Sequence, residues 1–252
     1  MGADFYTGVP GSGKSYHCAQ IIYNELRKGK NIISNIEIDI SKIPQKGKTP
    51  LGQYIYVSDR EWLSNSLRQY KKDYRGNLTP VLQPCTDKFS SIQGLRGFAL
   101  NFHKRNSKGA IVLHQTFLIF DECQKLWNAR SWNRIDRLAW VEFLTQYRKW
   151  GYDCILISQN ENMIDKQIRG SVIEHKIIHR NVSRFKKLGK IMSLPFGGNL
   201  FVCVECDYSM SSKKPQRFGH ILYMAVINIL IFMIQHRYFN ILGCRKSEFA
   251  ET

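Results

Sequence analysis

The chain has 252 residues, of which 43% are hydrophobic and 12% aromatic. This composition argues against a disordered protein and allows one substantial core. Its seven cysteines are odd in number and scattered, which argues against a secreted disulfide framework. The formal net charge of +17 predicts an anionic partner, either nucleic acid or an acidic membrane face.

The first predicted elements are a strand over residues 3–7, a glycine-rich turn, and a helix over residues 16–27 whose apolar residues recur at helical spacing. The turn fits the pattern G-x-x-x-x-G-K-[ST], with the residues Gly8, Val9, Pro10, Gly11, Ser12, Gly13, Lys14 and Ser15. Strand, turn and helix in this order predict a loop that binds the phosphates of ATP with its amides and the helix dipole. Lys14 is the predicted ligand of the β- and γ-phosphates, and Ser15 is a predicted ligand of Mg²⁺.

Residues 31–34 and 54–58 predict two further strands, and the pattern S-x-x-E at residues 58–61 predicts the start of a helix. Between residues 70 and 115 the sequence is rich in turn-forming residues and poor in periodicity. We interpret this region as an insertion or a lid, with no contact assigned to it.

An acidic pair follows the next predicted strand, in which four large apolar residues occupy positions 117–120. Such a run is typical of a strand buried on both faces, as in a parallel sheet. Asp121 is then the predicted Mg²⁺ ligand, and Glu122 is the predicted base that polarises a water for attack on the γ-phosphate. The alternative is that the two carboxylates only cap the next helix.

Residues 138–149 predict a helix that stops at Gly151, and residues 153–160 predict a strand that ends in polar side chains. Together with the preceding strand they form a predicted βαβ unit. Gln159 is the predicted sensor of the γ-phosphate, with Ser158 as the second candidate. A solvent-exposed loop glutamine is the alternative.

An adjacent Asp-Glu pair after a buried strand is typical of ATP-hydrolysing motors. These motors use an arginine to stabilise charge in the transition state, and we predict that this arginine comes from a neighbouring subunit. Arg148, at the end of the predicted crossover helix, and Arg169, after the sensor strand, are the two candidates.

Residues 171–180 and 200–205 predict the last strands. Between them lies a basic stretch around Phe185, made of Arg180, Arg184, Lys186, Lys187 and Lys190. Basic groups beside an aromatic ring suit nucleic acid, through phosphate contacts and stacking. A solvated hairpin is the alternative, and coat protein or lipid are further candidate partners of the stretch.

The C-terminal part of the sequence predicts a membrane-spanning segment after the ATPase domain. Residues 1–210 form the predicted ATPase domain, 211–219 a basic linker, 220–239 a membrane-spanning helix and 240–252 a short tail. The lysines and the arginine of the linker predict that the ATPase domain stays in the cytoplasm. A buried core helix is the alternative for the apolar run.

In this order, the motifs resemble the zonula occludens toxin family, which includes the filamentous-phage assembly ATPases encoded by gene I. The resemblance spans residues 1–206 and rests on residues 8–15, 120–124, 143–151, 157–160, 164–169 and 174–180. It implies an α/β three-layer P-loop NTPase fold of the RecA/FtsK-HerA type, with a mainly parallel central sheet and one C-terminal transmembrane helix.

The resemblance also implies a function. It implies an ATP- and Mg²⁺-dependent hydrolase that drives assembly and export of single-stranded DNA phage, as a homo-oligomer anchored once in the bacterial inner membrane. Single-stranded DNA and phage coat or assembly proteins are the further partners it implies. Family members commonly carry a sizeable domain beyond the membrane, whereas here residues 240–252 are all that follow the predicted span, so toxin activity is not carried over.

Two other functions fit the same motifs. One is a soluble DNA-translocating or packaging ATPase, and the other is a non-catalytic nucleotide-binding interaction protein or toxin. Intact Lys14, Ser15, Asp121 and Glu122 argue against the non-catalytic alternative.

Overall fold

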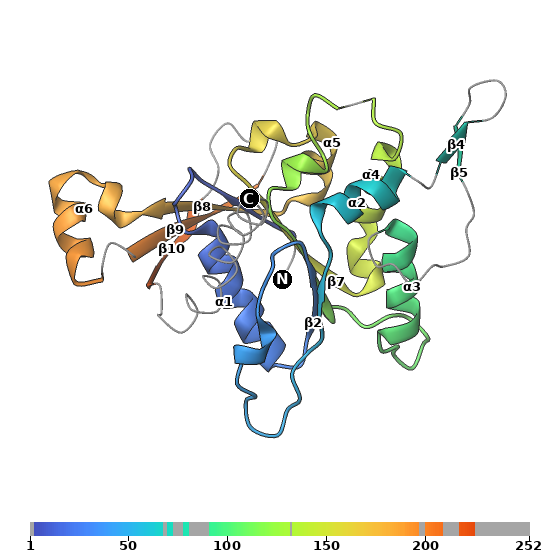
Figure 1. The fold of residues 1–252 in the computed structure, drawn as a ribbon, viewed down its shortest axis with the longest axis horizontal. Helices are drawn as coiled ribbons and strands as arrows, with labels where there is room; N and C mark the ends of the chain where they lie inside the picture. Colours follow the sequence, from blue (N-terminus) through green and yellow to red (C-terminus); the bar gives the residue numbers. More distant parts are fainter. Residues whose placement is uncertain are drawn as a thin grey trace, which may run out of the picture.

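The computed structural model describes residues 3–67, 70–72, 78–80, 91–131, 133–196, 200–208 and 217–224. Within them an eight-stranded sheet has the order β10-β9-β8-β1-β7-β6-β2-β3. Its strands are β1 (Ala3–Thr7), β2 (Asn31–Ser34), β3 (Tyr54–Tyr56), β6 (Thr116–Phe120), β7 (Tyr152–Ser158), β8 (His175–Asn181), β9 (Leu200–Asp207) and β10 (Arg217–Met224). A separate pair of short strands, β4 (Tyr70–Lys72) and β5 (Leu78–Pro80), lies apart from this sheet in Figure 1.

The sheet is mainly parallel, as the sequence predicts. Every pairing from β8 through β1, β7, β6 and β2 to β3 is parallel, and only β8–β9 and β9–β10 are antiparallel. All residues of β1, β6 and β7 are buried, because helices cover both faces of these strands. Parallel alignment brings the carboxyl ends of these central strands to one edge of the sheet, where the predicted site residues follow them.

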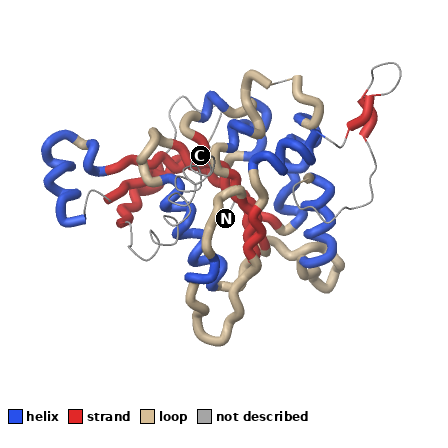
Figure 2. Tube along the Cα trace, viewed as in Figure 1, coloured by secondary structure: helices blue, strands red, loops and turns tan. Residues whose placement is uncertain are grey.

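Helices cover the sheet in two layers (Figures 1 and 2). On one face α1 (Lys14–Arg27) contributes Cys18, Ile22 and Leu26 to the core. On the other face lie α2 (Asp59–Leu67), α3 (Ile92–Phe102), α4 (Arg137–Gln146) and α5 (Lys166–Val172). Helix α6 (Lys186–Ser193) lies between β8 and β9 in the chain and projects from that side of the molecule (Figure 1). The predicted three-layer α/β architecture is therefore confirmed.

Large aromatic rings fix the second helix layer onto the sheet. Trp62 of α2 and Trp140 of α4 are 0% and 1% exposed. The Trp62 ring lies 5.1 Å from that of Phe120 in β6, and Trp140 lies 5.3 Å from Trp127. Tilted ring pairs at these separations add to the free energy of burial. They hold the end of β6, which carries the acidic pair, in a rigid surrounding.

Within the region predicted as an insertion or lid, residues 92–102 form a core helix, α3. Helix α3 is capped by Ser91, whose Oγ accepts a hydrogen bond from the Gly94 amide at 3.0 Å. It buries Leu95 and Phe98 against the sheet. The glycines within the helix, Gly94 and Gly97, disguise it in the sequence because glycine is typical of turns. Residues 81–90 lie outside the described part of the chain.

Truncation of Phe98 tests this correction. Phe98 is 2% exposed, so Phe98→Ala is expected to lower the free energy of unfolding by about 3–5 kcal/mol. Leu100→Ala, on the exposed face of the same helix, should change it by about 0.5 kcal/mol or less. Urea unfolding followed by circular dichroism compares the two. Equal effects would contradict the packing of α3 against the core.

The C-terminal prediction differs from the structure in two ways. The sheet continues past residue 210, since β10 pairs with β9 from Arg217↔Cys206 to Met224↔Leu200. The helix predicted for residues 220–239 therefore does not begin at His220, because residues 220–224 are extended. Residues 211–216 of the predicted linker and 225–252 lie outside the described residues. No helix in the described part of the chain is long and apolar enough to cross a bilayer.

Smaller differences concern element boundaries. The strand predicted for residues 171–180 begins at His175, because Ser171 and Val172 complete α5. The crossover α-helix ends earlier than predicted, at Gln146, and a 3₁₀ turn over Tyr147–Trp150 leads to the predicted stop, Gly151, which is in the left-handed region at φ 78°.

Candidate active site

The glycine-rich turn between β1 and α1 requires its glycines. Gly8, Gly11 and Gly13 have φ values of 146°, 71° and 93°, which side chains with a Cβ rarely adopt. A Cβ on Gly8 would lie 2.4 Å from the carbonyl oxygen of His179. The Ser12 amide donates to the Val9 carbonyl at 3.1 Å and closes the turn. The turn leads into the N-terminus of α1, which is the geometry that binds phosphate groups.

Lys14 directs its ammonium group at this turn. The side chain is largely buried, and Nζ donates to the carbonyl oxygens of Gly8 at 2.6 Å and Val9 at 3.3 Å. Burial lowers the pKa of Lys14, and the nearby carboxylates of Asp121 and Glu122 oppose that shift. A cation held in this position can neutralise the β- and γ-phosphates of a nucleotide.

Ser15 and Asp121 meet at the same edge of the sheet. Ser15 is in the first turn of α1 and Asp121 directly follows β6, and Ser15 Oγ lies 3.5 Å from Asp121 Oδ2. Burial is the main cause of a raised pKa for Asp121, and the positive charges of Lys14 and Lys125 only partly oppose it. A hydroxyl and a carboxylate oxygen side by side are the hard donors that Mg²⁺ prefers, so the pair fits the metal.

Asn35 positions Asp121, and the sequence analysis did not single it out. Its Oδ1 accepts from the Asp121 amide at 2.7 Å, and its Nδ2 donates to the Asp121 carbonyl at 2.8 Å. The same Nδ2 lies 2.5 Å from Asp59 Oδ1. Asn35 directly follows β2, the neighbour of β6, so the rule that selected Gln159 would have found it too.

Glu122 has a strained backbone. It is one of two non-glycine residues with positive φ in the described part of the chain, at φ 49° and ψ 43°. This conformation costs roughly 1–2 kcal/mol and is concentrated at functional sites. The Glu122 amide donates to Asp121 Oδ1 at 2.9 Å, which offsets part of that cost. The strain turns the Glu122 carboxylate toward the carboxyl end of β7.

Two amide side chains hold that carboxylate. Gln124 Nε2 donates to Glu122 Oε2, and Gln159 Nε2 lies 3.5 Å from Glu122 Oε1. Gln159 is itself held at the end of β7, because its carbonyl oxygen accepts from Thr7 Oγ1 at 3.2 Å. Ser158, the second sensor candidate, is fully buried and bonds the Asn160 carbonyl instead. Of the two sensor candidates, Gln159 is therefore the one whose side chain faces Glu122.

The two arginines predicted from the sequence lie elsewhere. Arg148 precedes β7 and is bound to Glu174, which precedes β8, so both lie at the amino edge of the sheet, opposite the glycine-rich turn. Arg169 of α5 donates to Asn162 Oδ1 at 2.7 Å. Among the described contacts neither arginine touches residues 8–15. Within a single chain, neither one completes the site.

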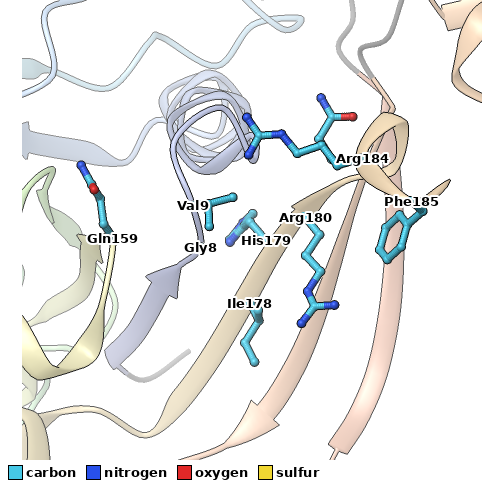
Figure 3. Close-up of a pocket in the computed structure, with 9 residues that line it drawn as sticks. Gly8, Val9, Gln159, Ile178, His179, Arg180, Arg184 and Phe185 are labelled. Carbon is cyan, nitrogen blue, oxygen red and sulfur yellow. The ribbon is translucent and has the colours of Figure 1, made fainter. Parts of the chain in front are cut away.

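A pocket of about 470 Å³ opens above the turn instead (Figure 3). One wall is Gln159, the floor is Gly8 and Val9, and the other wall is the end of β8 with the residues after it. The residues of that wall are Ile178, His179, Arg180, Asn181, Arg184 and Phe185. In Figure 3 Arg184 reaches toward the start of α1, whereas Arg180 points away from it.

A buried histidine pair supports the turn from below. His17 Nδ1 lies 2.8 Å from His179 Nε2, and Tyr6 packs against both rings. The Ile177 carbonyl lies 3.1 Å from His179 Nδ1 and can only accept, so this nitrogen carries the proton. Nε2 of His179 then accepts from His17. Burial lowers the pKa of His17 to about 4 and, with the neighbouring His17, that of His179 to about 3.

From this histidine pair we predict that the folded chain loses stability at acidic pH. The pKa values of both histidines are lower in the folded chain than the ordinary value of about 6.5. Their contribution to stability is therefore complete above pH ~6.5 and is lost as the pH falls toward 4. Asp4 acts in the opposite sense, since burial raises its pKa to about 6, and its contribution is lost as the pH rises through that value.

His17→Gln separates the two effects, because Asp4 is common to both proteins. The variant keeps a side-chain amide donor but removes one titrating ring. Between pH 4 and 6.5 its free energy of unfolding should depend on pH less steeply than that of the wild type, by roughly 1 kcal/mol per pH unit. Urea unfolding at several pH values measures both slopes, and equal slopes would refute the prediction.

Comparison with known proteins confirms the resemblance predicted from the motifs. Residues 87–192 match the family model "Zonular occludens toxin (Zot)". The Gene 1 protein of Enterobacteria phage fd is 28% identical over 218 residues, which cover 85% of this chain and 49% of that protein. The Gene 1 protein of Salmonella phage IKe is 25% identical over 197 residues, 77% of this chain and 45% of that protein. The chain thus spans about half the length of these curated relatives.

A solved structure supports the fold. The N-terminal domain of zonular occludens toxin from Neisseria meningitidis covers 92% of this chain and 98% of its own, with 16% sequence identity and a TM-score of 0.50. At this identity the likeness concerns the fold alone.

Proposed function

We propose that this chain is the ATP-hydrolysing motor of a filamentous-phage assembly protein that works at the inner membrane of a bacterial host. The observation that carries the proposal is the meeting of five side chains at one edge of the sheet. These are Lys14 and Ser15 of the first helix, Asp121 and Glu122 after β6, and Gln159 after β7. The likeness to Gene 1 proteins supports the role in phage assembly.

Each of these residues has a different role in the proposed hydrolysis of ATP. The amides of the turn and the Lys14 ammonium bind the phosphates of ATP and stabilise the charge that develops on them. Glu122 accepts a proton from the attacking water as the bond from water oxygen to the γ-phosphorus forms and the bond to the β-γ bridging oxygen breaks. Mg²⁺, held by Ser15 and Asp121, would neutralise the β- and γ-phosphate oxygens.

Gln159 links the nucleotide to the rest of the chain. Its amide faces Glu122, and its carbonyl is bound by Thr7 of β1. Loss of the γ-phosphate changes what the Gln159 amide can contact, and β7 carries that change into the sheet. This coupling is how a hydrolysis site moves a polymer or a protein subunit in a motor.

The surroundings of the motor are also part of the proposal. A homo-oligomer is the proposed working form, with single-stranded DNA, coat subunits or other assembly proteins as its cargo. The anchor predicted for residues 220–239 loses its first five residues to β10, so what we propose is attachment to the membrane through the apolar residues that follow Met224. The ATPase domain then lies on the cytoplasmic side.

The decisive experiment measures ATP turnover and phage release with the same variants. Full-length protein in detergent should hydrolyse ATP with Mg²⁺, and Lys14→Ala should reduce turnover at least ~100-fold. In infected cells that depend on a plasmid copy of this chain, Lys14→Ala should abolish phage release. Single-stranded DNA should stimulate turnover if DNA is the cargo.

Lys28→Ala is the matched control, because Lys28 lies beyond the end of α1 and pairs with Glu25. It should leave turnover and phage release unchanged. Normal phage release from Lys14→Ala would overturn the proposed function. Carbonate extraction of membranes tests the location, and full release of the chain from the membrane would favour a soluble DNA translocase.

A further inference from the structure

The segment after β8 lies over the glycine-rich turn because β8 runs parallel to β1. The two strands pair from Asp4↔His175 to Thr7↔Ile178, so the carboxyl end of β8 reaches the same edge as Gly8. The closeness is visible at Gly8, where an added Cβ would strike the His179 carbonyl. Arg180, Asn181, Arg184 and Phe185 therefore belong to the wall of the pocket above the turn.

Local hydrogen bonds hold Arg184 in this wall. Asn181 Oδ1 accepts from the Ser183 amide at 2.8 Å, and the Phe185 amide donates to the Val182 carbonyl at 2.9 Å. The Gly189 amide then donates to the Phe185 carbonyl at 2.8 Å. The resulting short helical turn presents the guanidinium of Arg184 to the crest of the glycine-rich turn.

The guanidinium comes close to the phosphate-binding backbone. Arg184 Nη2 lies 3.1 Å from the position of a Cβ on Gly11, so the group touches the face of the turn that a Cβ would occupy. Figure 3 shows Arg184 on one side of Gly8 and Val9 and Gln159 on the other. The space between them is the pocket beside the turn that is expected to bind the β- and γ-phosphates of a nucleotide.

In the described part of the chain, no carboxylate forms an ion pair with the Arg184 guanidinium. The sequence has no Asp or Glu between Glu174 and Glu205. Among the described ion pairs, Arg148, which the sequence suggested, binds Glu174, whereas Arg184 has no acidic partner. An anion that enters the pocket meets a planar donor suited to bidentate phosphate binding.

We propose that Arg184 is a catalytic residue that acts in cis, by donating hydrogen bonds to the β- and γ-phosphates of the nucleotide bound in its own subunit. During hydrolysis it stabilises the negative charge that gathers on the β-γ bridging oxygen as the bond to the γ-phosphorus breaks. Glu122 takes the proton of the attacking water on the opposite side. This assignment rests on the proposed function, since it requires a nucleoside triphosphate in the turn.

Arg184→Ala is expected to lower kcat by about 10²–10³-fold and to raise KM by about 10-fold. Arg184→Lys should recover only part of the loss, because an ammonium lacks the planar fork. The matched control Lys187→Ala removes an equal charge from the same projecting segment, outside the pocket, and should leave both constants unchanged. Turnover of Arg184→Ala within 2-fold of the wild type would overturn the assignment.

A mixing experiment separates cis from trans action. Subunits of Arg184→Ala mixed with subunits of Lys14→Ala should stay inactive, because no subunit then holds both groups. Recovery of turnover would show that Arg184 serves a neighbouring site and would overturn the cis assignment.

Equilibrium binding provides a test that does not depend on hydrolysis. Arg184→Ala should weaken binding of ATPγS about 10-fold and leave AMP binding unchanged, because AMP lacks the contacted phosphates. Unchanged ATPγS affinity would overturn the assignment even if the wild type had no turnover. Wild-type protein that binds ATPγS through Arg184 but hydrolyses no ATP would instead contradict the proposed motor function alone.

Discussion

Glu122→Gln is expected to reduce ATP turnover by about 10²–10⁴-fold and to leave ATP affinity nearly unchanged. The substitution keeps the shape of the side chain and its contacts with Gln124 and Gln159, but an amide cannot accept the proton of the attacking water. Lys14, Ser15 and Asp121 remain in place to bind the nucleotide. The variant should therefore accumulate in the ATP-bound state.

Two measurements distinguish this outcome from misfolding. Binding of a fluorescent ATP analogue reports affinity, and phosphate release under single-turnover conditions reports the chemical step. Glu142→Gln is the matched control, because Glu142 is exposed on α4 and pairs with Arg96. A Glu122→Gln variant that turns over ATP at the wild-type rate would show that another group is the base.

The effect of Glu122→Gln on phage release carries the test into the cell. An ATP-bound subunit that cannot hydrolyse should block a homo-oligomer, so co-expression with the wild type should reduce release. Lys14→Ala, which is expected to lack nucleotide, should interfere less. Equal interference from both variants would argue that subunits hydrolyse ATP independently.

The central part of this site could be predicted because its signals are local. Gly8–x–x–x–x–Gly13 with Lys14 is a continuous pattern, and the strand β6 that precedes Asp121 is apolar throughout. Parallel strands share an edge, so a pattern along one strand also places the residue that follows it. Thr7, Asp121 and Gln159 are brought together by this rule alone.

Arg184 could not be found in this way. Its place at the turn depends on which strand lies beside β1, and the sequence does not state that β8 is that neighbour. The basic stretch around Phe185 then has no reason to be assigned to the nucleotide rather than to DNA or lipid. Arg148 ends the predicted crossover helix, but in the structure it lies just before β7, at the edge of the sheet opposite the glycine-rich turn. Its role in a neighbouring subunit's site stays a prediction.

The sequence-based assignment of helices and strands is wrong where the local residue pattern favours a different structure from the one that tertiary packing stabilises. Glycines within α3 are typical of turns, but the burial of Leu95 and Phe98 against the sheet outweighs a propensity cost of about 1 kcal/mol for each glycine. Residues 220–224 are apolar enough for a membrane helix, but they pair with β9. Apolar runs of this length do not distinguish a strand from a helix.

Gly8→Ala is the second substitution with a large expected effect. The added methyl group would lie 2.4 Å from the His179 carbonyl and 2.8 Å from Ser12 Oγ, and φ at this residue is 146°. Neither the carbonyl of β8 nor the fully buried Ser12 can move without a shift of the turn. The carbonyl of residue 8 also positions Lys14 Nζ, so the shift displaces the ammonium from the phosphates. ATP affinity should fall by at least ~100-fold, equivalent to about 2.7 kcal/mol.

Gly47→Ala makes the comparison specific, because Gly47 also has positive φ, at 62°, but has no atom within 4 Å of an added Cβ. It should cost about 1–2 kcal/mol of stability for the left-handed backbone and leave ATP affinity unchanged. Isothermal titration with ATPγS measures affinity and urea unfolding measures stability for both variants. If Gly8→Ala lost stability but bound ATPγS normally, the close approach of β8 to the turn would have no role in nucleotide binding. The basis for placing Arg184 beside the phosphates would then fail with it, since both depend on the same contact between the two segments.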